Sequence, residues 1–200
     1  MQVTTSEIVF QTKPTLQGQK VILRPFMPED YSTMISLLED PEIRRLTGSA
    51  HTDEEANEPT SPEEAEHIKQ WYLSRNDQTN RLDLAIIEQA TGQLVGEVVF
   101  NDYEPTTHNV NFRILIGAAG RGKGLGTEAT ALFLRYGFEV IHLHKVELEV
   151  YSFIPCAERV YRKCGFMLEG IKCESFLYNG EYIDTKLLGL LRRDYAQKHE

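Results

Sequence analysis

Cysteine is scarce in this sequence, and its distribution excludes a disulfide-stabilised fold. The 200 residues include three cysteines, Cys156, Cys164 and Cys173, all in the last quarter of the chain. An odd number at these positions does not form a disulfide framework, so we expect a reducing, cytoplasmic location. No CxxC spacing is present, which argues against a structural metal site.

Long hydrophobic runs and an excess of positive charge are also missing. The longest apolar stretches, around residues 84–87 and 186–191, are far shorter than the roughly 20 residues that a membrane span requires. Residues 1–13 lack the basic start and the apolar stretch of a secretory signal. The 30 acidic and 21 basic residues give a net charge of −9, which favours a neutral or cationic partner. We therefore expect neither a membrane nor a nucleic acid as a direct partner.

The composition that is present is that of one folded domain. Hydrophobic residues make up 41% and charged residues 26% of the chain, which are ordinary proportions for a globular protein. We expect residues 1–17 to form an N-terminal arm or a first strand, residues 18–195 a single domain, and residues 196–200 a C-terminal tail.

Hydrophobic periodicity and turn residues predict strands interspersed with helices. Strands are expected at residues 20–24, 82–88, 94–101, 111–117, 145–151, 166–177 and 182–190. Helices are expected after residues 28, 40 and 61, and at residues 126–140 and 155–163. Residues 102–108 are predicted to form a loop, and Asn179 and Gly180 the best hairpin turn. The expected class is α/β.

A glycine-rich stretch between a predicted strand and a predicted helix carries the strongest functional signal. Five glycines occur within residues 117–126, together with Arg121 and Lys123 and without an acidic residue. Glycines allow successive backbone N–H groups to point into one concavity, and the start of a helix adds positive potential. The stretch is therefore predicted to bind a phosphate.

Two common phosphate-binding motifs fit this stretch poorly. It matches the P-loop pattern G-x-x-x-x-G-K up to Lys123, but Gly124 stands where a Ser or Thr must hold magnesium. A P-loop phosphotransferase is therefore a disfavoured alternative. The dinucleotide pattern G-x-G-x-x-G fails because neither Gly120 nor Gly122 has a glycine five residues later.

Two other motifs together resemble one enzyme superfamily. The pattern R-x-x-G-x-G is present at Arg121, Gly124 and Gly126, and the pattern A-x-x-x-Y-x-K-x-G-F starts at Ala157. In both, the sequence resembles the GNAT superfamily of acyl-CoA-dependent N-acetyltransferases. Within it, the chain is similar to the subgroup that acts on ribosomal-protein N-termini, polyamines and aminoglycosides. The resemblance covers residues 20–193.

The resemblance implies a GNAT fold, with a mixed, mostly antiparallel sheet flanked by helices. Its central strands, residues 111–117 and 145–151, are expected to part and admit acetyl-CoA. A bulge within residues 114–116 is expected to present the backbone N–H that contacts the acyl oxygen. The residues implied in cofactor binding are Leu115, Ile116, Arg121, Gly122, Lys123, Gly124, Leu125, Gly126, Thr127 and Tyr161.

The implied reaction is direct transfer of an acetyl group to a primary amine, on a protein N-terminus, a polyamine or another small amine. Tyr161 is the candidate acid, because a phenol with a pKa of about 10 can protonate a thiolate of slightly lower pKa. Glu149, twelve residues before Tyr161 as in some family members, and Glu97 are the candidate bases. Asp102, Glu104 and a water chain to bulk solvent are rivals for the base.

One residue departs from the family pattern and favours an alternative function. Ile154 stands where the subgroup has an asparagine, so one hydrogen bond worth about 1 kcal/mol is lost. A non-catalytic acyl-CoA-binding module is therefore the second hypothesis.

The remaining predictions concern metal, charge and assembly. His142 and His144 lack a third ligand, so no metal is predicted. The acidic residues of segment 53–66 are a candidate attractor for an ammonium acceptor. We expect a monomer or a homodimer.

Overall fold

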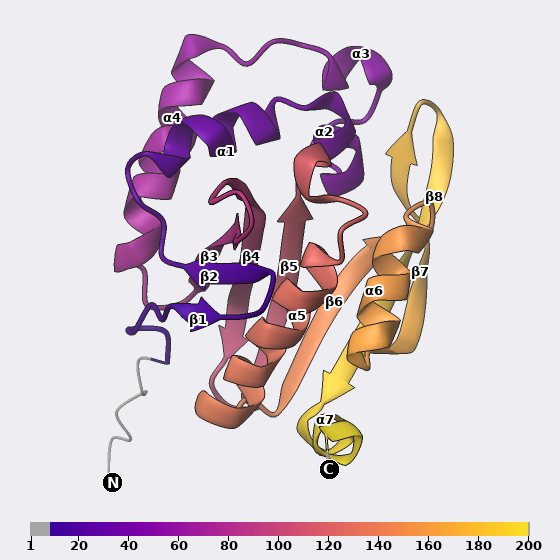
Figure 1. The fold of residues 1–200 in the computed structure, drawn as a ribbon. Helices are drawn as coiled ribbons and strands as arrows, with labels where there is room; N and C mark the ends of the chain where they lie inside the picture. Colours follow the sequence, from indigo (N-terminus) through magenta and orange to yellow (C-terminus); the bar gives the residue numbers. More distant parts are fainter. Residues whose placement is uncertain (1–8, 200) are drawn as a thin grey trace, which may run out of the picture.

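The computed structural model describes residues 9–199, in which helices cover a mixed sheet (Figure 1). The sheet has eight strands in the order β1-β2-β3-β4-β5-β6-β8-β7. They are β1 (Leu16–Gln17), β2 (Val21–Arg24), β3 (Leu82–Glu88), β4 (Leu94–Glu104), β5 (Asn109–Ile116), β6 (Lys145–Tyr151), β7 (Met167–Tyr178) and β8 (Glu181–Leu191). All neighbours are antiparallel except β5 and β6. The predicted α/β class and mostly antiparallel sheet are confirmed.

Two of the predicted helices begin at the capping residues that the sequence provides. The helices are α1 (Asp30–Leu38), α2 (Pro41–Thr47), α3 (Asp53–Ala56), α4 (Pro62–Ser74), α5 (Leu125–Arg135), α6 (Pro155–Cys164) and α7 (Arg192–His199). The Asp40 side chain accepts a hydrogen bond from the first turn of α2, and the Ser61 side chain does so for α4. Proline follows each cap, in the helix position where its missing N–H costs nothing.

Side chains of the strands alternate between two apolar cores, one on each face of the sheet. On β3, Leu84 and Ile86 join the larger core, to which α5 and α6 contribute. Ala85 and Ile87 join a smaller core with residues of α1 and α4. This alternation explains why β3 is buried along its whole length.

The sheet splits between its two parallel central strands. β5 and β6 are paired at only three positions, from Asn109–Lys145 to Asn111–Glu147. Beyond them the strands part, whereas β6 stays paired with β8 along its whole length, from Lys145 to Tyr151. The predicted parting of the central strands is confirmed.

The bulge expected within residues 114–116 is absent. The β4–β5 ladder runs without a register shift from Gly96–Ile116 to Asn101–Asn111, and its irregularity lies between Asn101 and Glu104. Asp102 adopts a positive φ of 53° there, which absorbs the extra residue. The strands part because the β5–β6 pairing ends, not because β5 bulges.

Three segments differ from the sequence-based expectation. β4 continues to Glu104 within the predicted loop, because Glu104 still pairs with Asn109. The short helix α3 was not predicted, although Thr52 caps it. Residues 196–199, expected as a tail, belong to α7, which is held by Tyr195 stacking on Phe138 at 4.8 Å.

The N-terminal arm is attached to the domain in the part that the structure describes. Residues 1–8 of the predicted arm lie outside the described residues. Phe10 is fully buried against Phe100 and Tyr103, and residues 16–17 form the edge strand β1. Of the helices within residues 9–199, none has the length and apolar character needed to cross a membrane.

Candidate active site

A cleft of about 1070 Å³ opens where β5 and β6 part. Its walls come from β4, β5, β6, α2, α6 and the glycine-rich stretch. The residues expected from the sequence that line it are Glu97, Leu115, Ile116, Arg121, Gly122, Gly124, Leu125, Gly126, Thr127, Glu149 and Tyr161. Asp102 also lines the cleft, whereas Lys123 and Glu104 do not. The fold thus gathers residues that are up to 64 positions apart, from Glu97 to Tyr161.

The glycine loop presents backbone N–H groups at the mouth of the cleft. Gly122 and Gly124 have positive φ values of 74° and 81°, which glycine adopts without strain. Within residues 9–199, the N–H groups of Gly122, Lys123 and Gly124 make no hydrogen bond. A Cβ on Gly122 would meet no atom within 4 Å. The loop and the start of α5 therefore fit the pyrophosphate of coenzyme A.

The two cations of the loop bind protein groups. Lys123 Nζ donates to both carboxylate oxygens of Glu88, at 3.0 and 3.1 Å, so its charge points away from the cleft. Arg121 Nε donates to the Ile116 carbonyl at 3.0 Å, and its Nη1 pairs with Glu42 of α2. The loop backbone is thus the better-placed phosphate donor.

Lys20 lies beside this loop and was missed by sequence reasoning. Its Nζ donates to the Lys123 carbonyl at 3.2 Å, and its backbone N–H donates to Glu128 of α5 at 2.9 Å. No local pattern around residue 20 signals this position, because it depends on the β1–β2 turn packing beside α5.

The open edge of β5 offers further backbone donors. Gly117 N–H donates to the Val95 carbonyl of β4 at 2.8 Å. Because successive residues of a strand direct their N–H groups to opposite sides, Leu115 faces β4 and Ile116 and Ile114 face the split. The Leu115 carbonyl indeed lies against Gly96, where a Cβ would come within 1.9 Å of it. Ile116 is thus better placed than Leu115 to contact an acyl oxygen.

Tyr161 places its phenol at the wall of the cleft from helix α6. Its ring packs edge-on against Phe112 and Phe166, at 6.3 and 5.9 Å between ring centroids. Within the described residues its hydroxyl has no hydrogen-bond partner. Burial raises the pKa of Tyr161 well above the usual value for a phenol, with Cys156 and Cys164 adding to the shift. The phenol therefore keeps its proton at neutral pH.

Helix α6 begins at Ile154 without a side-chain cap. Ile154 is buried and lines the cleft with an apolar side chain, at the position where the resemblance implies a polar contact.

Glu97 lies on β4 opposite Leu115, on the face of the sheet that carries α1 and α4. The Tyr72 hydroxyl of α4 donates to its Oε2 at 3.2 Å. Burial raises the pKa of Glu97, although Arg75, the Tyr72 hydrogen bond, Arg113 and Arg81 oppose the shift. A carboxyl with a raised pKa next to the acyl position suits a general base.

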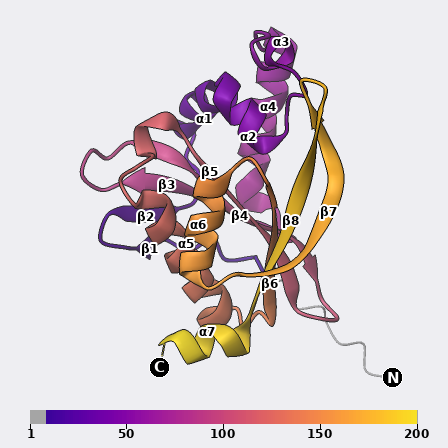
Figure 2. The same cartoon turned by 90° about the vertical axis from the view of Figure 1, so that its right-hand side faces the viewer.

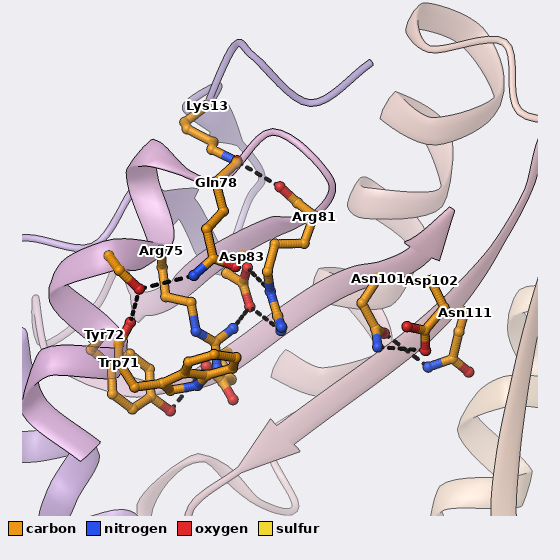
Figure 3. Close-up of polar contacts among 12 residues, drawn as sticks. Lys13, Trp71, Tyr72, Arg75, Gln78, Arg81, Asp83, Asn101, Asp102 and Asn111 are labelled. Carbon is orange, nitrogen blue, oxygen red and sulfur yellow. Dashed lines mark hydrogen bonds and ion pairs between the residues drawn. The ribbon is translucent and has the colours of Figure 1, made fainter. Parts of the chain in front are cut away.

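A buried ionic cluster supports this side of the cleft (Figure 3). Asp83 pairs with Arg75, and its Oδ2 lies 2.7 Å from Arg81 Nε. The Trp71 ring stacks beneath both guanidinium groups, at 4.1 and 5.0 Å. The acidic residue within the apolar stretch 82–87 was the only signal of this cluster in the sequence.

Glu149 lines the cleft from β6 on the same face of the sheet. It is exposed and forms an ion pair with Lys172 of β7. Its charge is therefore already matched, unlike that of a carboxylate held ready for a proton. Of the two candidate bases, Glu97 has the more suitable surroundings.

The acidic segment 53–66 does not line the cleft. Asp53 instead accepts hydrogen bonds from Tyr178 at 2.7 Å and from Asn179 at 2.8 Å. The Asn179 N–H donates to the His51 carbonyl at 2.9 Å. These contacts join α3 to the tip of the β7–β8 hairpin. Figure 2 shows the two elements next to each other. Asp53 therefore has a structural role, and the attraction of an ammonium acceptor by the segment stays a prediction.

Comparisons with known proteins agree with this architecture. A family model described as an acetyltransferase (GNAT) domain matches residues 20–167. The spermidine N(1)-acetyltransferase of Vibrio cholerae is 32% identical over 115 residues, which are 58% of this chain and 66% of that protein. The uncharacterized N-acetyltransferase YokL of Bacillus subtilis is 26% identical over 182 residues, covering 91% and 96% of the two chains.

A solved structure shows the same fold. The crystal structure of spermidine N-acetyltransferase from Vibrio cholerae in complex with CoA and spermine superposes with a TM-score of 0.75. The match covers 90% of this chain and 99% of that one, at 24% identity. The split sheet and the glycine loop at its mouth define an α/β protein of the acyl-CoA-binding class. The chain belongs to the GNAT acetyltransferase family.

Proposed function

We propose that the protein transfers an acetyl group from acetyl-CoA to a primary amine. The observation that carries this proposal is the cleft at the β5–β6 split, which unites the free N–H groups of the glycine loop with Tyr161 and Glu97. Acetyl-CoA supplies an activated thioester when it is bound. The N–H groups of Gly122, Lys123 and Gly124 bind its pyrophosphate.

The acyl end then lies on the open edge of β5. The Ile116 N–H stabilises the negative charge that develops on the acyl oxygen, because it faces the split and points away from β4. The amine approaches from the opposite face of the sheet, where Glu97 projects. This arrangement lets donor and acceptor meet through the split.

Proton transfers complete the reaction. Glu97 removes a proton from the ammonium form of the acceptor, and the pKa raised by burial makes it a stronger base than an exposed glutamate. The amine nitrogen bonds to the acyl carbon, the carbon–sulfur bond breaks, and Tyr161 delivers its proton to the departing thiolate of coenzyme A. The second proton of the nitrogen is lost to solvent, from which Tyr161 regains a proton. Transfer is direct, so no covalent enzyme intermediate forms.

The acceptor class is tested by a panel of amines. The protein is incubated with acetyl-CoA and with spermidine, other polyamines, N-terminal peptides or aminoglycosides, while thiol release and product mass are followed. Spermidine is included because several similar proteins are named as spermidine N(1)-acetyltransferases. We expect equal amounts of free thiol and acetylated amine.

The second candidate function is a non-catalytic acyl-CoA-binding module. Ile154 at the uncapped start of α6 favours it, because that position lacks the polar contact expected beside the cofactor. Binding of acetyl-CoA in calorimetry without turnover of any amine would support the module. Absence of both binding and turnover would contradict both functions.

A further inference from the structure

Arg113 places a positive charge on the acceptor side of the cleft. It lies on β5 opposite Val99, two residues before Leu115, so it shares a face with Leu115 and Glu97. The residue lines the cleft and is exposed. Along the strand it is about 6.6 Å from Leu115, at two residues of about 3.3 Å each.

Within residues 9–199 this guanidinium makes no hydrogen bond and no ion pair, and its contact with the cleft carboxylates is limited to the longer-range charge that lowers the pKa of Glu97. If the β5–β6 pairing continued beyond Asn111 and Glu147, Glu149 would face Arg113 across the ladder. The strands part before that point, and Glu149 pairs with Lys172 instead. The split that opens the cleft therefore also leaves Arg113 unpaired.

The carboxylates of the cleft, in contrast, each accept a hydrogen bond or form an ion pair, and Glu97 keeps only its second oxygen for the reacting amine. Glu97 accepts from Tyr72, Glu149 pairs with Lys172, and Asp102 accepts from Asn101 at 2.8 Å. Figure 3 shows the contact between Asn101 and Asp102. A polyamine carries several ammonium groups, which are attracted by carboxylates whose charge is not already matched. This cleft offers an unpaired cation instead.

We propose that Arg113 binds a carboxylate of the acceptor, so that the preferred substrate is an amine that also carries a carboxylate. The inference rests on the proposed acetyl transfer and narrows its substrate class. The planar guanidinium matches a carboxylate with two parallel hydrogen bonds. Binding there leaves the amine beside Glu97 and the acyl position at Leu115 and Ile116.

The test uses acceptors that differ by one carboxylate. Lysine is compared with cadaverine, and ornithine with putrescine, in assays of kcat/KM with acetyl-CoA. We expect the amino acid of each pair to be preferred at least about tenfold, the contribution of one charge-assisted pair of hydrogen bonds. In Arg113→Gln this preference disappears, while Arg113→Lys retains part of it.

Arg159→Gln is the matched control, because Arg159 is exposed on α6 and does not line the cleft. It is expected to keep the full preference. The inference is wrong if wild type acetylates cadaverine or spermidine with the same kcat/KM as lysine. It is also wrong if Arg113→Gln lowers kcat/KM equally for both members of a pair. In either case acetyl transfer itself stands. If coenzyme A binds but no amine of any class releases thiol, acetyl transfer itself fails and the inference falls with it.

Discussion

The hydroxyl of Tyr72 donates a 3.2 Å hydrogen bond to Oε2 of Glu97 and so joins helix α4 to the floor of the cleft. Tyr72 is almost fully buried, which fixes its ring against Phe26 at 5.0 Å between centroids. A carboxylate held in this way keeps one oxygen in place while the other is available to an acceptor. Replacing Glu97 is therefore expected to change the rate of acetyl transfer, and replacing Tyr72 is expected to change its pH dependence.

Replacing the carboxylate removes the proposed base. In Glu97→Gln we expect kcat to fall by about 10²- to 10⁴-fold, the usual contribution of a general base, with little change in the affinity for acetyl-CoA. Steady-state kinetics and calorimetry measure the two quantities. Glu104→Gln is the control, because Glu104 lies outside the cleft and accepts hydrogen bonds from Thr106. Equal losses in both variants would remove Glu97 from the mechanism.

The pH dependence reports on the hydrogen bond itself. Burial raises the pKa of Glu97, so activity should fall with decreasing pH through a value above the usual one for glutamate. Since the Tyr72 hydrogen bond lowers this pKa, Tyr72→Phe should move the acidic limb of the kcat/KM profile to higher pH. A limb that stays in place in Tyr72→Phe would indicate that another group titrates.

The phenol of Tyr161 is predicted to act in turnover and not in binding. Tyr161→Phe should lower kcat by about 10²-fold or more while the dissociation constant of acetyl-CoA stays unchanged. Because burial raises its pKa, wild-type activity should not decline through loss of this proton between neutral pH and pH 9. Tyr31→Phe, at a buried tyrosine of the smaller core, is the matched substitution. Unchanged turnover in Tyr161→Phe would assign the proton to water.

Cysteine reactivity should reveal where coenzyme A lies. Cys156 is exposed and lines the cleft, whereas Cys173 is exposed on β7 outside it. Coenzyme A is therefore expected to slow alkylation of Cys156 by iodoacetamide without affecting Cys173. Cys164 should react slowly with or without ligand, because burial raises its pKa to about 11. Peptide mass spectrometry follows the three sites, and equal protection of Cys173 would contradict the assignment of the cleft.

Gly96 is predicted to be required for the approach of β5 to β4. A Cβ at this position would lie 1.9 Å from the Leu115 carbonyl oxygen, so Gly96→Ala must displace the backbone beside the acyl position. We expect a loss of about 1–3 kcal/mol in the free energy of unfolding, typical of overpacking, together with a lower kcat. Gly170→Ala is the control, since its Cβ would meet Leu187 at an ordinary 3.6 Å. Denaturant unfolding measures both variants.

Much of the fold could be predicted from local sequence signals. Residues 82–88 and 145–151 were predicted as strands with the bounds that the structure has, because their β-branched residues are bordered by polar turns. Asn179 and Gly180 both adopt positive φ, as their hairpin turn requires. Helix α7 was missed because its hold on the domain depends on Tyr195 meeting Phe138, a contact between distant segments.

The candidate site also has parts that local sequence signals predicted and parts that depend on contacts between distant segments. The glycine motif located the loop, in which Gly122 and Gly124 adopt the positive φ that glycine favours. The directions of the side chains of Arg121 and Lys123 were not predictable, because Glu42 and Glu88 come from other parts of the chain. The base could not be chosen from the sequence, because the partners of Glu97 and Glu149 are set by tertiary packing.

The short parallel junction between β5 and β6 has a consequence for the order of events. Only three residue pairs connect the two halves of the sheet. An acyl donor bound between the strands would take the place of a strand. The amide groups of its pantetheine arm would form hydrogen bonds with the unpaired edge of β5. The surface that receives the amine would then be completed by the first substrate, so the donor would enter before the acceptor.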